Sequence, residues 1–430
     1  MRLTRLRVKN FRSIADIDIP LSPLTVLVGP NGSGKSNVVD ALRFVRDVFA
    51  RGLDQAVMDR EGMGVIQRWG TEGIEIGITV ELDEVKEYKH ENRVISRAEP
   101  ASKFEYSFSF SSSDNQGLII RQESIKINAD NVPQMVVTLD EEVMTIKYDR
   151  MDWVNEVVIS SAKAMISPNV KGPEGLFDET EFTLFDDEDW LDYYKQEEGY
   201  SWRRLGVAVM RLESSLQKML FYTLNHAELR QPQQILKQNP FDEKGRNIAA
   251  VLRHLKLADH TAWDELRFAL QQVVDGFNDI YIEPVGGYLA TKLIYQTNTT
   301  EPRTSYIGQE SDGTIRMLGL LAVLYQDPAQ PFLSIEEPEA NIHPGALAVL
   351  ASVLDEASLR SQVLVTTHSP DMLDHLPAES FLVVEKVGDT THVGPLDASQ
   401  LASVRKRLFT PGELLRMEGL QRQTTPNSAA

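Results

Sequence analysis

Residues that could carry out chemistry lie in four short motifs, and the first is a glycine-rich loop near the N-terminus. Its sequence, GPNGSGKS, fits the pattern G-x-x-x-x-G-K-[ST] and stands between an apolar run and a segment of helical periodicity. Glycines let the backbone N–H groups turn inward around an anion, and the N-terminus of the next helix adds partial positive charge. We expect Lys35 to reach the β- and γ-phosphates of ATP, and the Ser36 hydroxyl to ligate Mg²⁺. The predicted phosphate-binding residues are Gly29, Pro30, Asn31, Gly32, Ser33, Gly34, Lys35 and Ser36.

The second motif, IEEPE, places carboxylates directly after a short apolar run. Phe332 to Ile335 predicts a buried strand, which would deliver Glu336 to the Mg²⁺ shell. Glu337, one position on, could orient or deprotonate the attacking water. The usual first acid is Asp, so the longer Glu336 leaves open a direct or a water-mediated Mg²⁺ contact. The alternative is an ordinary strand end with a solvated acidic turn, and the loop upstream favours the functional interpretation.

The third motif places His368 directly after another apolar run, Gln362 to Val365. Ligands bind at the carboxyl ends of strands in open α/β sheets, so this histidine would lie at the nucleotide. A lone histidine more often makes a structural hydrogen bond. The first two motifs favour the functional alternative.

The fourth motif, ESDGT at Glu310 to Thr314, opens a helix and therefore offers a second helix N-terminus to an anion. Its spacing alone favours a plain capped helix with Ser311 or Asp312 as N-cap. The predicted apolar face of this helix consists of Ile315, Leu318, Leu321 or Ala322, and Tyr325.

The elements that must position these motifs predict an α/β fold. Strands are expected over 3–8 and 24–28, followed by a helix whose apolar face includes Val38, Leu42, Val45 and Phe49. Alternating runs from about Ile74 to Ile159 predict antiparallel hairpins. An acidic segment, 178–198, is expected to be a solvated linker or flap, and 202–277 has helical periodicity. Strands and helices alternate again beyond Tyr306.

Composition excludes several classes of function. The chain contains no Cys, so disulfides, Cys-based zinc sites and thiol nucleophiles are absent. It has no apolar run long enough to cross a bilayer and no signal-peptide pattern, so we expect a cytoplasmic protein without a membrane partner. The net charge of −19 argues against a surface that binds nucleic acid everywhere. Local basic patches occur at residues 2–12 and 405–407, where ordinary solvated side chains are the favoured interpretation.

In their order along the chain, the motifs resemble those of the ABC-type ATPases of the SMC and RecF group, and within it the OLD-like ATPases of bacterial defence systems. The shared features are an N-terminal LRVKNFRSI strand, the loop at 29–36, ESDGT, IEEPE with the following Asn341-Ile342-His343-Pro344, and His368 in TTHSP. This resemblance implies a P-loop NTPase head of ABC/SMC type: a mixed sheet with flanking helices, an antiparallel β lobe and a helical insertion. The implied domains are 1–85 (first half of the head), 86–200 (β lobe and acidic linker), 201–300 (helical insertion), 301–423 (second half of the head) and 424–430 (disordered tail).

In this family two ATP molecules are sandwiched between two heads. The resemblance therefore implies that Ser311 and Gly313 contact the γ-phosphate bound by Lys35 of the partner subunit. It also implies that His368 senses this phosphate, that Glu337 acts on the water, and that Asn341 lies in the D-loop that crosses the interface. Gln67 is a weak candidate for the family's Q-loop glutamine.

The chain also departs from these relatives. It lacks the long coiled coil of SMC proteins, and about 60 residues follow His368, too few for the Toprim nuclease domain of OLD proteins. We therefore expect a homodimer or higher homo-oligomer that binds ATP and Mg²⁺ and controls a separate effector, such as a Toprim-like or other nuclease, in DNA-related anti-phage defence. The alternatives are a RecF-like repair ATPase that clamps duplex DNA and, less favoured by the motifs, a nucleotide-binding subunit of a transporter.

Overall fold

A computed structural model of the chain describes two compact units, each built from separated segments. The first comprises Met1–Leu21, Asn37–Lys218 and Val387–His392; the second comprises Ser22–Ser36, Met219–Lys386 and Val393–Ala430. The described residues are 1–90, 93–99, 101–113, 117–129, 132–140, 143–148, 155–158, 207, 209–234, 240–296 and 302–423. The predicted acidic segment at 178–198 and the predicted disordered tail at 424–430 lie outside them.

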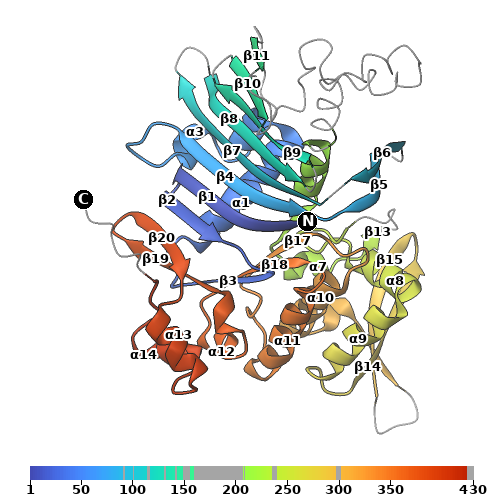
Figure 1. The fold of residues 1–430 in the computed structure, drawn as a ribbon. Helices are drawn as coiled ribbons and strands as arrows, with labels where there is room; N and C mark the ends of the chain where they lie inside the picture. Colours follow the sequence, from blue (N-terminus) through green and yellow to red (C-terminus); the bar gives the residue numbers. More distant parts are fainter. Residues whose placement is uncertain are drawn as a thin grey trace. The chain divides into compact units, whose positions relative to one another are not determined.

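The first unit contains an antiparallel sheet, as the alternating sequence predicts (Figure 1). Its strand order is β11-β10-β9-β8-β7-β4-β1-β2, and β5 and β6 form a separate hairpin. The strands are β1 (Arg2–Phe11), β2 (Ile14–Pro20), β4 (Ile74–Leu82), β5 (Val85–His90), β6 (Arg93–Glu99), β7 (Ser102–Ser113), β8 (Gly117–Ala129), β9 (Val132–Asp140), β10 (Val143–Tyr148) and β11 (Asn155–Val158).

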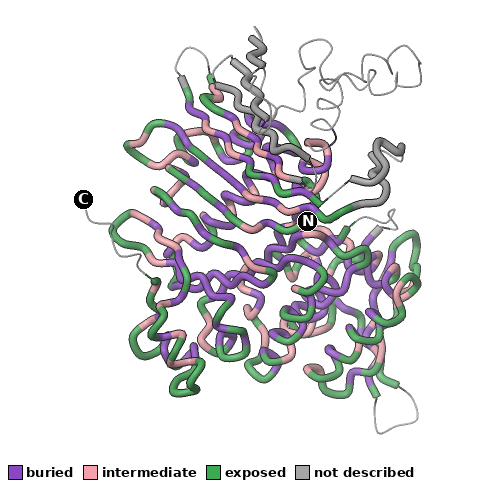
Figure 2. The backbone as a smooth tube through the Cα atoms, in the orientation of Figure 1, coloured by how far each residue is buried: buried purple, intermediate pink, exposed green. Residues whose placement is uncertain are grey.

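Helix α1 (Lys35–Arg51) provides the aromatic centre of this unit's core. The Phe44 ring lies 5.7 Å from that of Phe11 and 5.6 Å from that of Phe110, measured between centroids. Alternate residues of β7, from Phe104 to Phe110, are buried, which is the period-2 pattern of a strand with one covered face (Figure 2). Two short helices follow α1: α2 (Leu53–Met58) and α3 (Met63–Ile66).

The second unit is built on parallel strands in the order β19-β3-β18-β17-β12. They are β3 (Leu24–Val28), β12 (Met219–Tyr222), β17 (Phe332–Glu336), β18 (Gln362–Thr367) and β19 (Phe381–Val387), and the next strand along the chain is β20 (Thr390–Pro395). All residues of β3 and β18 are buried, as is usual for parallel strands covered on both faces. The carboxyl ends of these strands share one edge, which is where the predicted motifs begin.

Helices and a small antiparallel sheet complete the second unit. The helices are α7 (His226–Leu229), α8 (Ile248–Ala258), α9 (His260–Gln271), α10 (Asp312–Tyr325), α11 (Leu347–Ala357), α12 (Pro370–Leu373), α13 (Ala398–Arg405) and α14 (Pro411–Met417), with 3₁₀ turns η1 (Ile307–Gln309), η2 (Pro344–Ala346) and η3 (Ala378–Ser380). The small sheet contains β13 (Gln233–Gln234), β14 (Phe277–Val285), β15 (Tyr288–Tyr295) and β16 (Arg303–Tyr306). None of the helices in the described part of the chain is both long and apolar enough to span a membrane.

The structure confirms the predicted α/β class but corrects two local expectations. The segment 202–277, expected to be helical, also contains β12, because four consecutive apolar residues from Met219 to Tyr222 pair in parallel with β17. Strands β14 and β15 lie near the end of the predicted helical insertion, after helices α8 and α9. Helix α10 is buried from Ile315 to Tyr325 on all sides, whereas the sequence predicts a single apolar face.

Candidate nucleotide-binding site

The phosphate-binding loop joins β3 to α1, as predicted. Gly34 has a φ of 107°, a left-handed conformation that L side chains rarely adopt. Gly29 leaves no room for a side chain, because a Cβ there would lie 2.2 Å from the carbonyl oxygen of Val384. The two glycines therefore shape a tight backbone cradle at the start of a 17-residue helix, the arrangement expected of an anion site.

Lys35 is held inside this loop. Its Nζ donates hydrogen bonds to the carbonyl oxygens of Gly29 at 2.7 Å and Pro30 at 3.1 Å. Burial lowers the pKa of Lys35, while the negative charges of Glu337 and Glu339 act to raise that pKa. The second motif thus acts electrostatically on the lysine of the first.

Ser36 and Glu336 meet in a geometry that suits a magnesium ion. The Ser36 hydroxyl donates to Oε2 of Glu336 across 3.2 Å. Two neighbouring ligands of an octahedral Mg²⁺ at about 2.1 Å each lie about 3.0 Å apart, so both oxygens fit the shell of one ion. The donor set of the pair is also the oxygen-only set that Mg²⁺ prefers.

Glu337 and His368 form the next part of the site. Oε1 of Glu337 lies 3.1 Å from Nδ1 of His368, and both side chains are partly exposed. The backbone of Glu337 has a φ of 44°, and its N–H donates to the carbonyl oxygen of Thr366 at 3.0 Å. Because β17 and β18 are parallel neighbours, the acid at the end of one strand meets the histidine after the other.

Sequence reasoning missed Arg316, a buried cation on α10. One guanidinium nitrogen donates to the carbonyl oxygen of Leu224 at 2.8 Å, and another donates to those of Glu337 at 3.0 Å and Glu336 at 3.3 Å. Arg316 therefore holds the turn that carries both acids. The available signal is a single arginine in the apolar run TIRMLGLL, since a charge inside a buried helix requires a specific partner.

Glu339, the last acid of IEEPE, is a further residue that the sequence analysis leaves without a role. Its carboxylate accepts a hydrogen bond from the hydroxyl of Thr367. The same hydroxyl accepts from the backbone N–H of Ser369 at 3.0 Å. Glu339 and Thr367 therefore join the turns that follow β17 and β18.

The ESDGT motif begins α10 as predicted, with Ser311 as the N-cap. The Ser311 side chain accepts a hydrogen bond from the backbone N–H of Thr314 at 3.2 Å, while Asp312 is the first helical residue. A Cβ at Gly313 would lie 2.8 Å from the carbonyl oxygen of Asn341. Asn341 itself has a left-handed backbone, with a φ of 63°. The motif and the turn after IEEPE therefore touch each other within one subunit.

Comparison with known proteins identifies the family. Residues 1–373 match the family described as AAA ATPase domain. The chain belongs to this family. The motifs predict a relationship to the OLD, Smc and RecF ATPases. Local sequence matches to these relatives confirm it.

This AAA ATPase matches its curated relatives over short stretches only. It is 58% identical to the OLD nuclease of Thermus scotoductus over 43 residues, which cover 10% of this chain and 8% of that protein. It is 43% identical to the DNA replication and repair protein RecF of Brucella abortus over 58 residues, covering 13% and 15%. A solved Smc head bound to the C-winged helix domain of ScpA aligns over 93% of this chain and 99% of its own, at 14% identity and a TM-score of 0.49.

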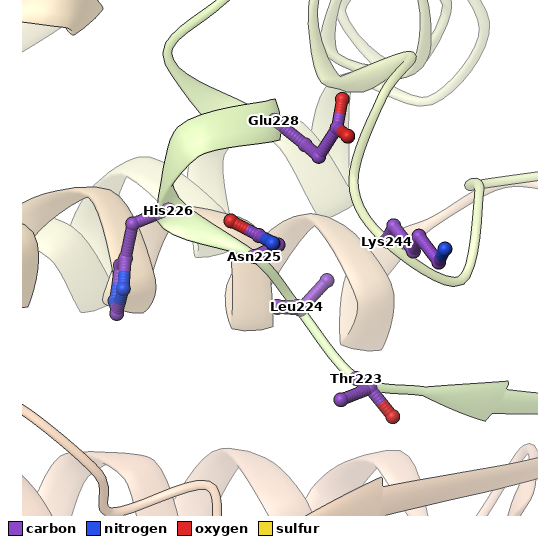
Figure 3. Close-up of a pocket in the computed structure, with 6 residues that line it drawn as sticks. All are labelled: Thr223, Leu224, Asn225, His226, Glu228 and Lys244. Carbon is purple, nitrogen blue, oxygen red and sulfur yellow. The ribbon is translucent and has the colours of Figure 1, made fainter.

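Two further features of the ATPase lie apart from the residues of the candidate nucleotide-binding site. Gln67, the weak Q-loop candidate, belongs to the first unit, where its side-chain amide donates to the carbonyl oxygen of Thr71. In the second unit, a cavity of about 340 Å³ lies at the carboxyl end of β12. Figure 3 shows the strand end, the short helix α7 and the neighbouring loop around it; the lining residues are Thr223, Leu224, Asn225, His226, Glu228 and Lys244.

Proposed function

We propose that two copies of this ATPase associate head to head around two ATP molecules and hydrolyse them. This cycle controls a separate effector, a nuclease, in DNA-related anti-phage defence. The observation that carries the proposal is the joint placement of Lys35, Ser36 with Glu336, and Glu337 with His368 at one edge of the parallel sheet. These are the parts that phosphoryl transfer to water requires: a phosphate cradle, a metal site and a base.

Each group has a distinct task in this mechanism. The loop N–H groups and Lys35 bind the phosphates. Ser36 and Glu336 would hold Mg²⁺, which would supply charge neutralisation. Glu337 accepts the proton of the attacking water, and His368 orients the Glu337 carboxylate through the 3.1 Å contact. Ser311 and Gly313 close over the phosphate of the partner subunit, by analogy with the family.

The RecF-like alternative, a clamp on duplex DNA, gains no support from the N-terminal basic patch. Arg5 and Arg7 both pair with Asp18 on the neighbouring strand. Lys9 pairs with Glu75, and Arg12 with Asp40. Because these acids offset part of the positive charge, the patch attracts DNA phosphates less than its sequence alone indicates. Salt-dependent DNA binding by the wild type would favour the alternative.

The decisive variant is Glu337→Gln, which keeps the size of the side chain but removes its basicity. We expect it to bind ATP, to lose hydrolysis by about 100-fold or more, and to accumulate as an ATP-bound dimer. Phosphate release and sedimentation velocity with and without ATP measure the two effects. Lys35→Ala is the matched control, which should bind no ATP and stay unchanged on its addition. Wild-type turnover in Glu337→Gln, or no ATP-dependent association, contradicts the proposal.

Control of an effector is a separate part of the proposal and needs its own measurement. Glu337→Gln and Lys35→Ala, each carrying the same affinity tag, can be recovered from the native host in the presence of ATP. We expect a nuclease to copurify with the first variant and not with the second. A nuclease recovered equally with both, or with neither, contradicts ATP-dependent control.

A further inference from the structure

Arg230, the residue that caps the C-terminus of α7, holds the loop before the ESDGT helix. One guanidinium nitrogen donates to the carbonyl oxygen of Gly308 at 3.3 Å, and the other donates to that of Glu310 at 3.0 Å. The second nitrogen also pairs with the Asp312 carboxylate at 2.5 Å. A single side chain therefore contacts the loop at three places within five residues.

Tyr295 of β15 provides a second attachment to the same loop. Its hydroxyl donates to Oε2 of Glu310 at 2.7 Å. Burial raises the pKa of Tyr295, and the hydrogen bond to Glu310 raises this pKa further, so the hydroxyl remains a donor at neutral pH. Both attachments come from the segment between β12 and β16, which the sequence analysis leaves without a role.

The charge of Asp312 gives Arg230 a specific task. The N-terminus of α10 favours anions, but Asp312 is its first residue and its side chain is 58% exposed. An unpaired carboxylate beside Gly313 would repel any triphosphate that approaches this end of the helix. The Arg230 guanidinium neutralises that carboxylate at hydrogen-bond distance.

We infer that Arg230 is a positioning residue for the ATP sandwich. It fixes the loop at residues 308–312, called the ESDGT loop below, and neutralises Asp312. Ser311 and Gly313 can then accept the phosphate bound by the partner subunit. The inference rests on the head-to-head dimer of the proposed function. It assigns α7 and the strands after it to the assembly of the ATP site, through contacts made within one subunit.

The test places Arg230→Gln in the Glu337→Gln background, where the ATP-bound dimer is longest-lived. We expect the dimer dissociation constant in ATP to rise about 10-fold or more, because the substitution leaves the Asp312 charge unpaired. The ATP affinity of the monomer, set by Lys35 and its loop, should stay unchanged. Arg246→Gln is the matched control, since Arg246 forms its ion pair with Asp242 and not with the ESDGT loop. Sedimentation gives the first constant and a fluorescent ATP analogue the second.

A rescue experiment separates charge neutralisation from a merely structural effect. Adding Asp312→Asn to the Arg230→Gln variant removes the repelling charge and should restore most of the lost association. Arg230→Lys, which keeps the charge, should lose less than Arg230→Gln. If the rescue fails, or if Arg230→Gln dimerises as tightly as its parent, the inference is overturned while the sandwich stands. If Glu337→Gln itself never associates with ATP, the proposed function fails, and the inference fails with it.

Discussion

Glu337 is fixed through its backbone as much as through its side chain. Its left-handed φ of 44° is a conformation that costs free energy in a residue with a Cβ and persists only where neighbours enforce it. Here the carbonyl oxygen of Thr366 accepts its N–H, and Arg316 donates to its carbonyl oxygen. These two contacts fix the backbone of Glu337, and its carboxylate lies 3.1 Å from Nδ1 of His368. The proposed base is therefore held in place through both its backbone and its side chain.

Gly313 gives a prediction at the scale of a single residue. Replacing it with Ala introduces a Cβ 2.8 Å from the carbonyl oxygen of Asn341, a contact that real structures do not tolerate. Either the start of α10 or the Asn341 turn must shift. Steady-state ATP hydrolysis should fall about 10-fold or more, because small displacements of positioning groups are costly in catalysis. ATP affinity should be unaffected, since Gly313 lies outside the loop at 29–36.

Gly308→Ala is the control for this substitution. Its Cβ would meet the carbonyl oxygen of Arg230 at 3.7 Å, an ordinary van der Waals distance, and its backbone carbonyl would still accept from Arg230. We expect near wild-type hydrolysis. If Gly313→Ala also retains wild-type hydrolysis, the close approach to Asn341 has no functional consequence.

At the scale of elements, the sequence predicts best where the signal is local. Strand β3, the loop after it and α1 follow from an apolar run, a glycine pattern and helical periodicity in adjacent residues. Strand β12 does not, because its four residues become a strand only by pairing with β17, more than a hundred positions later. Arg230 escapes prediction for the same reason, because its partner Glu310 lies 80 positions later. Tyr295 is 15 positions from Glu310, and no motif marks that pair.

Helix α1 gives a prediction about stability. Phe44 is fully buried against the rings of Phe11, Phe108 and Phe110. Phe44→Ala should destabilise the first unit by about 3–5 kcal/mol, the usual cost of a large cavity in a packed core. Unfolding in urea, followed by tryptophan fluorescence, should shift to a lower midpoint. Phe268→Ala, at a side chain that is 63% exposed, should change stability by less than about 0.5 kcal/mol. An unchanged midpoint for Phe44→Ala would contradict this description of the core.

At the scale of the whole molecule, the candidate site is assembled from distant parts of the chain within one unit. The second unit takes its phosphate-binding loop from Ser22–Ser36 and its acids, histidine and ESDGT helix from Met219–Lys386. The order of motifs predicts which residues belong together, through its resemblance to that of the ABC-type ATPases. It gives no information on Arg316 or Arg230, since no motif marks them.

A sandwich makes a prediction about mixtures that no single-chain mechanism shares. Lys35→Ala disables the loop of its own chain, and Gly313→Ala disables the helix start offered to the partner, so each variant alone should hydrolyse little ATP. A mixed dimer still holds one intact site, built from the loop of one chain and the ESDGT helix of the other. Hydrolysis by the 1:1 mixture should therefore clearly exceed that of either variant alone, in proportion to the number of mixed dimers that form.

The matched control for this mixture is Lys35→Ala with Glu337→Gln. Lys35 and Glu337 serve the same site in the same chain, so a mixed dimer of these two variants retains no complete site and should remain inactive. Phosphate release measured for each variant alone and for each 1:1 mixture decides the matter. If hydrolysis recovers in the first mixture and not in the control mixture, every site spans two chains. The rate of ATP hydrolysis is then a measure of how much of this ATPase is dimeric. Rates in the first mixture that equal the average of its separate components would show that each chain hydrolyses ATP on its own.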